Sequence, residues 1–246
     1  ISVPLIGSKR RLIKIAEMNA QQMFESKFDA ASRYDELAKG LAKTLGLKQM
    51  PRRIECVDIS NFQGSDIVGA LVSFFDGEPD KSRYRKYNIS QQGKPDDFAS
   101  INEVVTRRLK RGVEEADLPD LLIIDGGPGQ LSEALAARED ARANVEIVAL
   151  AKERTLAETG SGRTEKNPER IFISGRAEPI ELDYGSEVTH FVQRVRDEVH
   201  RFVITFHRSK RSKRVFRSAL DDIAGVGPER RRRLLKARGS VENIKR

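Results

Sequence analysis

Two aspartates stand at the ends of apolar, strand-like segments of this 246-residue chain. Asp58 lies near the far end of residues 53–60, and Asp125 directly ends the apolar run 121–124. Continuous apolar runs of this kind are typical of strands buried on both faces, as in a parallel sheet. If the two strands are neighbours, their carboxylates converge and repel each other unless a cation or a proton lies between them. Carboxylate oxygens are hard ligands, so the pair predicts a site for Mg²⁺ or Mn²⁺.

A cap or turn is the alternative role for each aspartate, since Asp commonly follows a strand in this way. Asp125 precedes Gly126 and Gly127 and fits that role on its own, whereas Ile59 continues the strand after Asp58. The two aspartates together therefore favour a metal site.

Two other residues are weaker candidates for chemistry. Asp97 stands just before a helix predicted to begin at Phe98, and we expect Asp97 to cap that helix, with a functional role as the alternative. His200 flanks the apolar stripe of the last predicted helix, where a histidine is more often a partner in a local hydrogen bond than a catalyst.

The apolar pattern predicts the elements that would position these residues. Strands are expected at 54–60, 67–75, 83–89, 121–124 and 145–150, a hairpin at 171–173 and 179–182, and helices after Asp97, at 131–142 and at 187–207. Three strands, a helix, strand–helix–strand and a closing helix make a mixed α/β sheet in ribonuclease H-like order. A doubly wound dinucleotide fold would instead alternate strand and helix from the start.

Composition points to a polyanionic partner. The chain has 45 Lys and Arg against 37 Asp and Glu, a net charge of +8, and a pI near 9.6. Nucleic acid is the usual partner of such a protein, with an anionic membrane surface as the alternative. The single cysteine, Cys56, excludes an intrachain disulfide and suits a reducing cytoplasm. No run approaches the length of a membrane span, and because the chain opens on Ile1 we expect a piece of a longer protein.

The C-terminal tail carries a second binding signal. A basic run at 207–214 is followed by Gly225-Val226-Gly227-Pro228, which is typical of a helix–hairpin–helix element with proline at the first helical position. Its backbone N–H groups would hold a DNA phosphate without reading sequence, although an ordinary helical turn is the alternative. The expected DNA contacts are Gly225, Gly227, Arg230, Arg231, Lys210 and Arg211.

These features divide the chain into four expected parts. They are a helical lead-in that packs on the domain (1–50), a ribonuclease H-like domain (51–207), a basic linker (208–217) and a partial helix–hairpin–helix domain (218–246). Residues 154–169 are polar and predict a loop.

The ordered motifs resemble those of the C-terminal half of the UvrC family. They are Glu55-Cys56-Val57-Asp58-Ile59-Ser60, Tyr87-Asn88-Ile89, Asp96-Asp97-Phe98, the segment 125–131, the segment 196–202 and Gly225-Val226-Gly227-Pro228. The resemblance implies a ribonuclease H-like endonuclease that makes the 5′ cut near a lesion in double-stranded DNA, with UvrB as partner and UvrA acting upstream. It also implies that Asp58, Asp125 and His200 form the catalytic set and that Asp97 is a further acidic position linked to incision. The UvrC amino-terminal half and the second helix–hairpin–helix are absent from these 246 residues.

The mechanism expected from the sequence is metal-assisted hydrolysis at Asp58 and Asp125. His200 would complete the coordination or transfer a proton, and Lys152 would steady developing phosphate charge. A catalytically silent nucleic-acid-binding module and a ribonuclease H-type enzyme for RNA–DNA hybrids are the competing interpretations.

Overall fold

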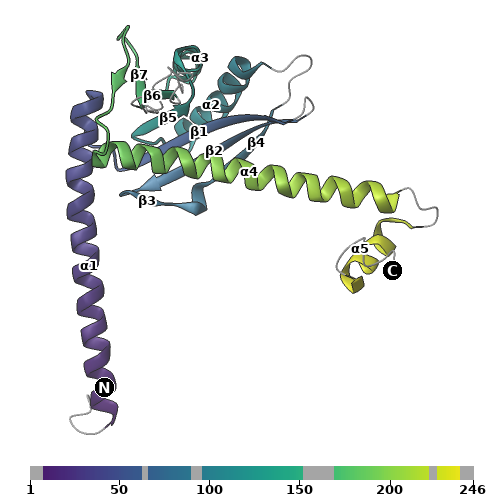
Figure 1. Ribbon diagram of the computed structural model, residues 1–246, viewed down its shortest axis with the longest axis horizontal. Helices are drawn as coiled ribbons and strands as arrows, with labels where there is room; N and C mark the ends of the chain where they lie inside the picture. The colour runs from purple at the N-terminus through teal and green to yellow at the C-terminus, as the bar shows by residue number, and fades with distance from the viewer. Residues whose placement is uncertain (1–7, 63–65, 90–95, 152–168, 222–225, 239–246) are drawn as a thin grey trace, which may run out of the picture.

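The computed structural model describes residues 8–62, 66–89, 96–151, 169–221 and 226–238. These residues form one mixed sheet with helices on both faces, and two long helices extend beyond the sheet (Figure 1). Among the described residues, no helix has both the length and the apolar character needed to cross a bilayer.

Eight strands make the sheet. They are β1 (Arg53–Phe62), β2 (Asp66–Phe75), β3 (Glu78–Pro79), β4 (Arg85–Asn88), β5 (Leu121–Asp125), β6 (Glu146–Ala151), β7 (Arg170–Ile173) and β8 (Ile180–Glu181). Their order is β3-β2-β1-β5-β6-β7-β8, and β4 also pairs with β2. The only strand without a sequence prediction among those described is the two-residue β3, which is too short to show a period.

The pairing directions agree with the predicted fold. β2 pairs antiparallel with both β1 and β4, and β5 and β6 run parallel to β1. β7 pairs antiparallel with β6, and β8 pairs antiparallel with β7. The tight turn after β2 is formed by Asp76 and Gly77, both with positive φ (48° and 82°), which suits a two-residue hairpin turn. The predicted mixed α/β sheet of ribonuclease H-like order is confirmed.

The helices form a layer on each face of the sheet. They are α1 (Ser8–Leu45), the one-turn 3₁₀ helix η1 (Lys81–Arg83), α2 (Asp97–Glu114), α3 (Pro128–Asp140), α4 (Glu187–Asp221) and α5 (Pro228–Arg238). α2 and α3 bury their apolar faces with Val57, Leu122 and Ile124. α4 and the C-terminal part of α1 bury theirs on the opposite face with Cys56 and Ile123.

Among the side chains that the structure describes, those of the lead-in helix that pack on the domain lie toward its C-terminal end. Tyr34 and Leu41 are buried against the sheet, whereas Leu12, Ile15 and Met18 are 54–66% exposed. The expectation that the whole lead-in packs on the domain is therefore wrong for these three side chains. Their loose helical spacing forms a helix, but Figure 1 shows that this part of α1 extends away from the sheet.

The last long helix is longer than its apolar stripe predicts. The stripe ends near residue 206, but α4 continues to Asp221, so residues 208–217 are helical instead of forming a linker. Lys and Arg are good helix formers, and a helix already nucleated by packing at residues 191–203 propagates through them at little cost.

Candidate active site

The pairing of β1 with β5 places Asp58 beside Asp125. Val57 pairs with Ile124 in this parallel ladder, so the two aspartates are the next residues along it. Side chains alternate between the faces of a strand. Cys56 and Ile123 face α4, and the two aspartates, each two residues further on, face the same way.

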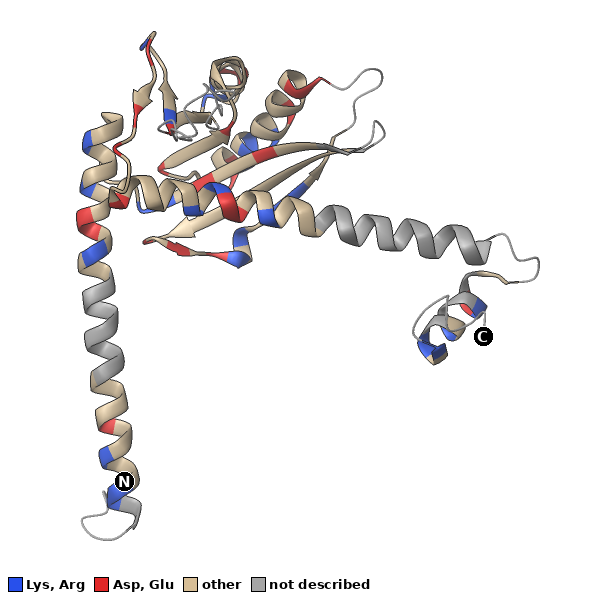
Figure 2. Ribbon diagram, viewed as in Figure 1, with Lys and Arg blue, Asp and Glu red and all other residues tan. Residues whose placement is uncertain are grey.

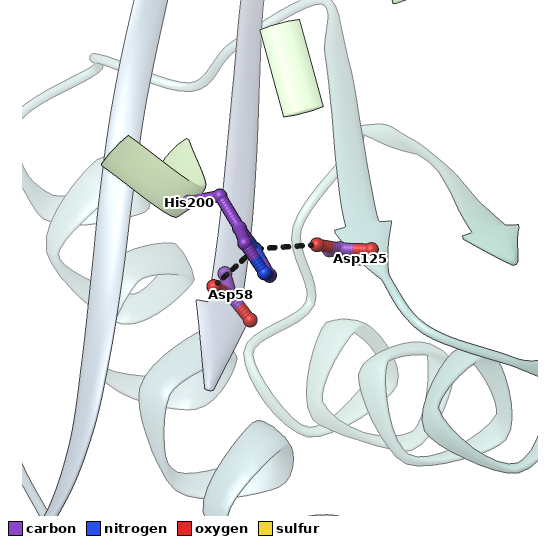
Figure 3. A group of neighbouring side chains, drawn as sticks. All are labelled: Asp58, Asp125 and His200. Carbon is purple, nitrogen blue, oxygen red and sulfur yellow. Dashed lines mark ion pairs between the residues drawn. The ribbon is translucent and has the colours of Figure 1, made fainter. Parts of the chain in front are cut away.

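α4 brings His200 onto the same carboxylates. Its Nδ1 lies 3.1 Å from Oδ2 of Asp58 and 3.4 Å from Oδ2 of Asp125, as Figure 3 shows. One ligand atom from each residue lies within 4.8 Å of the other two. The carboxylates are 7% and 11% exposed and the imidazole is 56% exposed, so the site opens to solvent on the histidine side. The predicted closeness of Asp58 and Asp125 is confirmed.

The charge in this cluster is costly without a cation. Burial and the negative charge of Asp58 together raise the pKa of Asp125 to about 6, although His200 and Arg196 oppose the rise. Burial, with help from both aspartates, also raises the pKa of Cys56 well above its ordinary value, so that residue stays a neutral thiol beneath the site.

An ion pair beside the site anchors α4. The Arg196 guanidinium, one turn before His200, donates to both carboxylate oxygens of the buried Glu169 at 2.6 and 2.7 Å. Gln193 adds a bond to the same carboxylate at 3.2 Å. Because Glu169 directly precedes β7, this network ties α4 to the sheet close to His200, and sequence analysis did not identify it.

The three converging side chains fit a divalent cation by the chemistry of their donors. Two carboxylate oxygens suit Mg²⁺ and Mn²⁺, and an imidazole nitrogen is better suited to Mn²⁺ than to Mg²⁺. His200 points its Nδ1 at both carboxylates, so it can complete a ligand set or accept a hydrogen bond through a bound water. Sequence spacing alone had favoured a local hydrogen-bond role for this residue.

The prediction for Asp97 is wrong, because the neighbouring Asp96 caps the helix. The Asp96 carboxylate accepts from the backbone N–H groups of Phe98 and Ala99 at 2.9 and 3.2 Å. The helix begins at Asp97, one residue earlier than expected, so the cap position moves back by one. Asp97 is exposed in the first turn, and the close group formed by Asp58, Asp125 and His200 does not include it.

The remaining predicted residues lie in the tail or beyond β6. Lys152 and Gly225 lie outside the described residues, and Lys210, Arg211 and Arg231 lie on helices without described side chains. Gly227 and Arg230 are exposed, and Pro228 begins α5 as expected for the second helix of the motif. The DNA-binding role of these positions stays a prediction.

Sequence analysis missed a second buried ion pair, on the other face of β1. The Arg108 guanidinium donates through Nε and Nη2 to the two oxygens of Glu55, at 2.7 and 2.8 Å. Glu55 is 1% exposed, and its charge between the apolar residues Ile54 and Cys56 was the available signal. Burial raises the pKa of Glu55, and the guanidinium opposes that rise.

Comparison with known proteins identifies the family of the chain. Residues 42–204 match the family model described as the UvrC RNAse H endonuclease domain. The chain is 42% identical over 99% of its length to the UvrABC system protein C of Protochlamydia amoebophila and 38% identical over 99% to that of Syntrophotalea carbinolica. It spans about two fifths of those relatives, 39% and 40% of their lengths.

Solved structures resemble the chain more distantly. Endonuclease V of Bacillus subtilis is 12% identical, with a TM-score of 0.38 over 78% of this chain and 94% of that one. Human ENDOV is 10% identical, with a TM-score of 0.37 over 64% and 86%. These scores are too low to support an argument about this chain.

Proposed function

The chain belongs to the UvrC family, with the UvrC RNAse H endonuclease domain at residues 42–204, and from that premise we propose that it is a metal-dependent DNA endonuclease. The observation that carries the proposal is the convergence of Asp58, Asp125 and His200 within 4.8 Å. Two nearly buried carboxylates beside a half-exposed imidazole are costly to maintain for structure alone.

Asp58 and Asp125 would hold Mg²⁺ or Mn²⁺, and His200 is placed to join them. When bound, the ion supplies Lewis-acid activation of the scissile phosphate and of the attacking water. Asp58 and Asp125 would be held ionised beside that positive charge, which would oppose the effects of burial and of Asp58 on the pKa of Asp125. His200 reaches both carboxylates from the open side, so its imidazole is positioned to ligate the ion or to move a proton at the reacting oxygen.

The biological setting follows from the relatives named UvrABC system protein C. We propose that the domain makes the 5′ incision beside a lesion in double-stranded DNA during nucleotide excision repair in the cytoplasm. In the whole protein it would act with UvrB after UvrA. The net charge of +8 suits a DNA substrate.

A nicking assay on a lesion-containing duplex tests the proposal. We expect cutting with Mn²⁺ or Mg²⁺, none in EDTA, and a loss of at least about 10³-fold in Asp58→Asn, since a bound metal stabilises the transition state by several kcal/mol. Asp140→Asn, an exposed aspartate at the end of α3, is the matched control and should cut normally.

Two results would overturn parts of the proposal. Full cutting by a folded Asp58→Asn protein would overturn the role of Asp58 in the metal site, and DNA binding by the wild type without metal-dependent cutting would leave only a nucleic-acid-binding module. Preferential cutting of an RNA–DNA hybrid over the lesion duplex would indicate a ribonuclease H-type enzyme.

A further inference from the structure

A basic groove lies beside α4, away from the candidate active site. Its volume is about 460 Å³, and it combines four exposed cationic side chains with two aromatic rings. The residues that line this β4 groove are Lys81, Tyr84, Arg85, Lys86, Arg201 and Phe202. None of them is acidic, and Figure 2 shows basic segments around η1 and β4 next to α4.

The strand register places Lys86 directly across the sheet from Asp58, with one residue of β2 between them. Asp58 pairs with Ala70 on β2, and Ala70 pairs with Lys86 on β4. Residues directly opposite one another in a ladder share a face, so Lys86 and Asp58 belong to the same face of the sheet. Two strand spacings separate their backbones by only about 10 Å.

α4 crosses this face between the site and the groove. It packs on β1 and β2, the strands between Asp125 and Lys86. His200 and Phe202 are two residues apart, so they project about 200° apart around the helix. His200 contacts the carboxylates, whereas Phe202 packs edge-to-face on Tyr84 with ring centroids 5.0 Å apart. The groove and the active site therefore lie on opposite flanks of one helix.

Polar contacts hold the groove wall without cancelling its charge. Glu198 accepts the Tyr84 hydroxyl at 2.8 Å and both bonds from Arg201 at 2.6 and 2.7 Å. Arg85 donates to two backbone carbonyls, which carry no formal charge. The Lys86 ammonium lies 4.8 Å over the Phe202 ring. The four cations of the lining outnumber the nearby carboxylates Glu198 and Asp80, which leaves a net positive concavity that a polyanion would relieve.

We propose that the β4 groove binds the phosphate backbone of the DNA substrate, so that the substrate straddles α4 while one strand reaches Asp58 and Asp125. This inference rests on the proposed nuclease function and extends it with a positioning site. The positive charge of the groove suits DNA, and the position of the groove favours DNA over an acidic protein segment. Lys86 shares a face with the active site at a short spacing, so any DNA backbone that enters the active site lies within reach of Lys86.

Salt-dependent DNA binding in EDTA tests the groove without any cutting. The intact 246-residue chain is titrated with a fluorescein-labelled DNA duplex, and log Kd is plotted against log salt. We expect the slope of the Lys81→Ala/Lys86→Ala double variant to fall in magnitude by about 1.8, since each lost phosphate contact removes about 0.9. Lys86→Arg keeps the charge and should keep the slope.

Lys110→Ala is the matched control, because Lys110 is exposed on α2, which covers the opposite face of the sheet. A double variant that melts like the wild type but binds with the slope of this control overturns the proposal, and binding of an acidic peptide at the groove would then be the replacement. Because binding is measured without metal, a failure of the nuclease proposal leaves this result readable on its own. Shortening the duplex from one end should abolish the effect of the double variant once the DNA no longer spans α4.

Discussion

Glu55 and Asp58 are three residues apart on β1 and show two ways to bury a carboxylate. Glu55 faces α2 and is met by a bidentate arginine, which also donates to the backbone oxygen of Asp117 at 2.7 Å. Asp58 faces α4 and meets a second carboxylate and a half-exposed histidine. The charge of Glu55 is neutralised by an arginine of the chain, whereas Asp58 lies beside a second negative charge.

The charge of the groups around a carboxylate separates a structural acid from a candidate functional one better than burial does. Both side chains are nearly inaccessible, with Glu55 at 1% and Asp58 at 7% exposed. A built-in guanidinium satisfies every oxygen of Glu55, whereas the Asp58–Asp125 pair gains most from a cation supplied by solvent. We therefore expect substitutions on the α2 face to change stability and those on the α4 face to change chemistry and metal response.

Arg108→Met should give the largest change in stability. Removing the guanidinium leaves Glu55 buried and uncompensated, which costs about 3–5 kcal/mol in the free energy of unfolding. Arg111→Met is the control one turn away, where the partner Glu115 is exposed, and it should cost at most about 0.5 kcal/mol. Equal losses in urea unfolding for the two variants would contradict the structural role of the Glu55–Arg108 pair. Adding Glu55→Leu to Arg108→Met should recover part of the loss.

Asp125→Asn should stabilise the metal-free protein at neutral pH. The folded-state pKa rises from 3.8 to about 6, so ionised Asp125 opposes folding above that pH. This rise in pKa predicts that the unfolding free energy of Asp125→Asn exceeds that of the wild type by up to about 3 kcal/mol at pH 7. An acid whose pKa is higher in the folded state favours folding at low pH, and this contribution is lost as the pH rises from the unfolded pKa to the folded pKa. Below about pH 4 the carboxyl group of Asp125 is protonated in both states. The difference in unfolding free energy between the variant and the wild type should therefore vanish there.

Melting curves in EDTA across pH measure this difference, and metal should reverse it. Mn²⁺ should raise the Tm of the wild type and leave Asp125→Asn almost unchanged, because binding to the folded state alone stabilises it. A wild-type protein that is the more stable of the two in EDTA at pH 7 would contradict the charge-repulsion account.

The smallest effect concerns Asp96 and Asp97, the acidic pair at the start of α2. Asp96→Ala should cost about 1 kcal/mol in unfolding free energy, because two backbone N–H groups lose their acceptor. Asp97→Ala loses only a helix-dipole interaction and should cost about 0.5 kcal/mol. If Asp97→Ala keeps its stability but loses nicking, Asp97 acts in incision as the family resemblance implies, whereas unchanged nicking would contradict that role.

Local pattern was sufficient wherever one strand or turn carried its own signal. The apolar runs before Asp58 and Asp125, the turn at Asp76 and Gly77, and the β7–β8 hairpin were all predicted, because alternation, burial and turn chemistry act over a few residues. The mixed sheet followed from the order of these elements. The cap at Asp96 lay one residue away from its prediction, because adjacent aspartates offer equivalent side chains and only the backbone selects between them.

Residue types and their spacing were enough to predict two carboxylates at the ends of buried strands, a basic chain and a ribonuclease H-like order of elements. Only the tertiary structure decided that His200 meets both aspartates, that Arg108 neutralises Glu55, and that Lys86 shares a face with Asp58. The physical reason is that each of these relations joins residues at least 28 positions apart, through strand pairing or helix packing. No local period records such contacts, because they form only when the sheet and its helices come together.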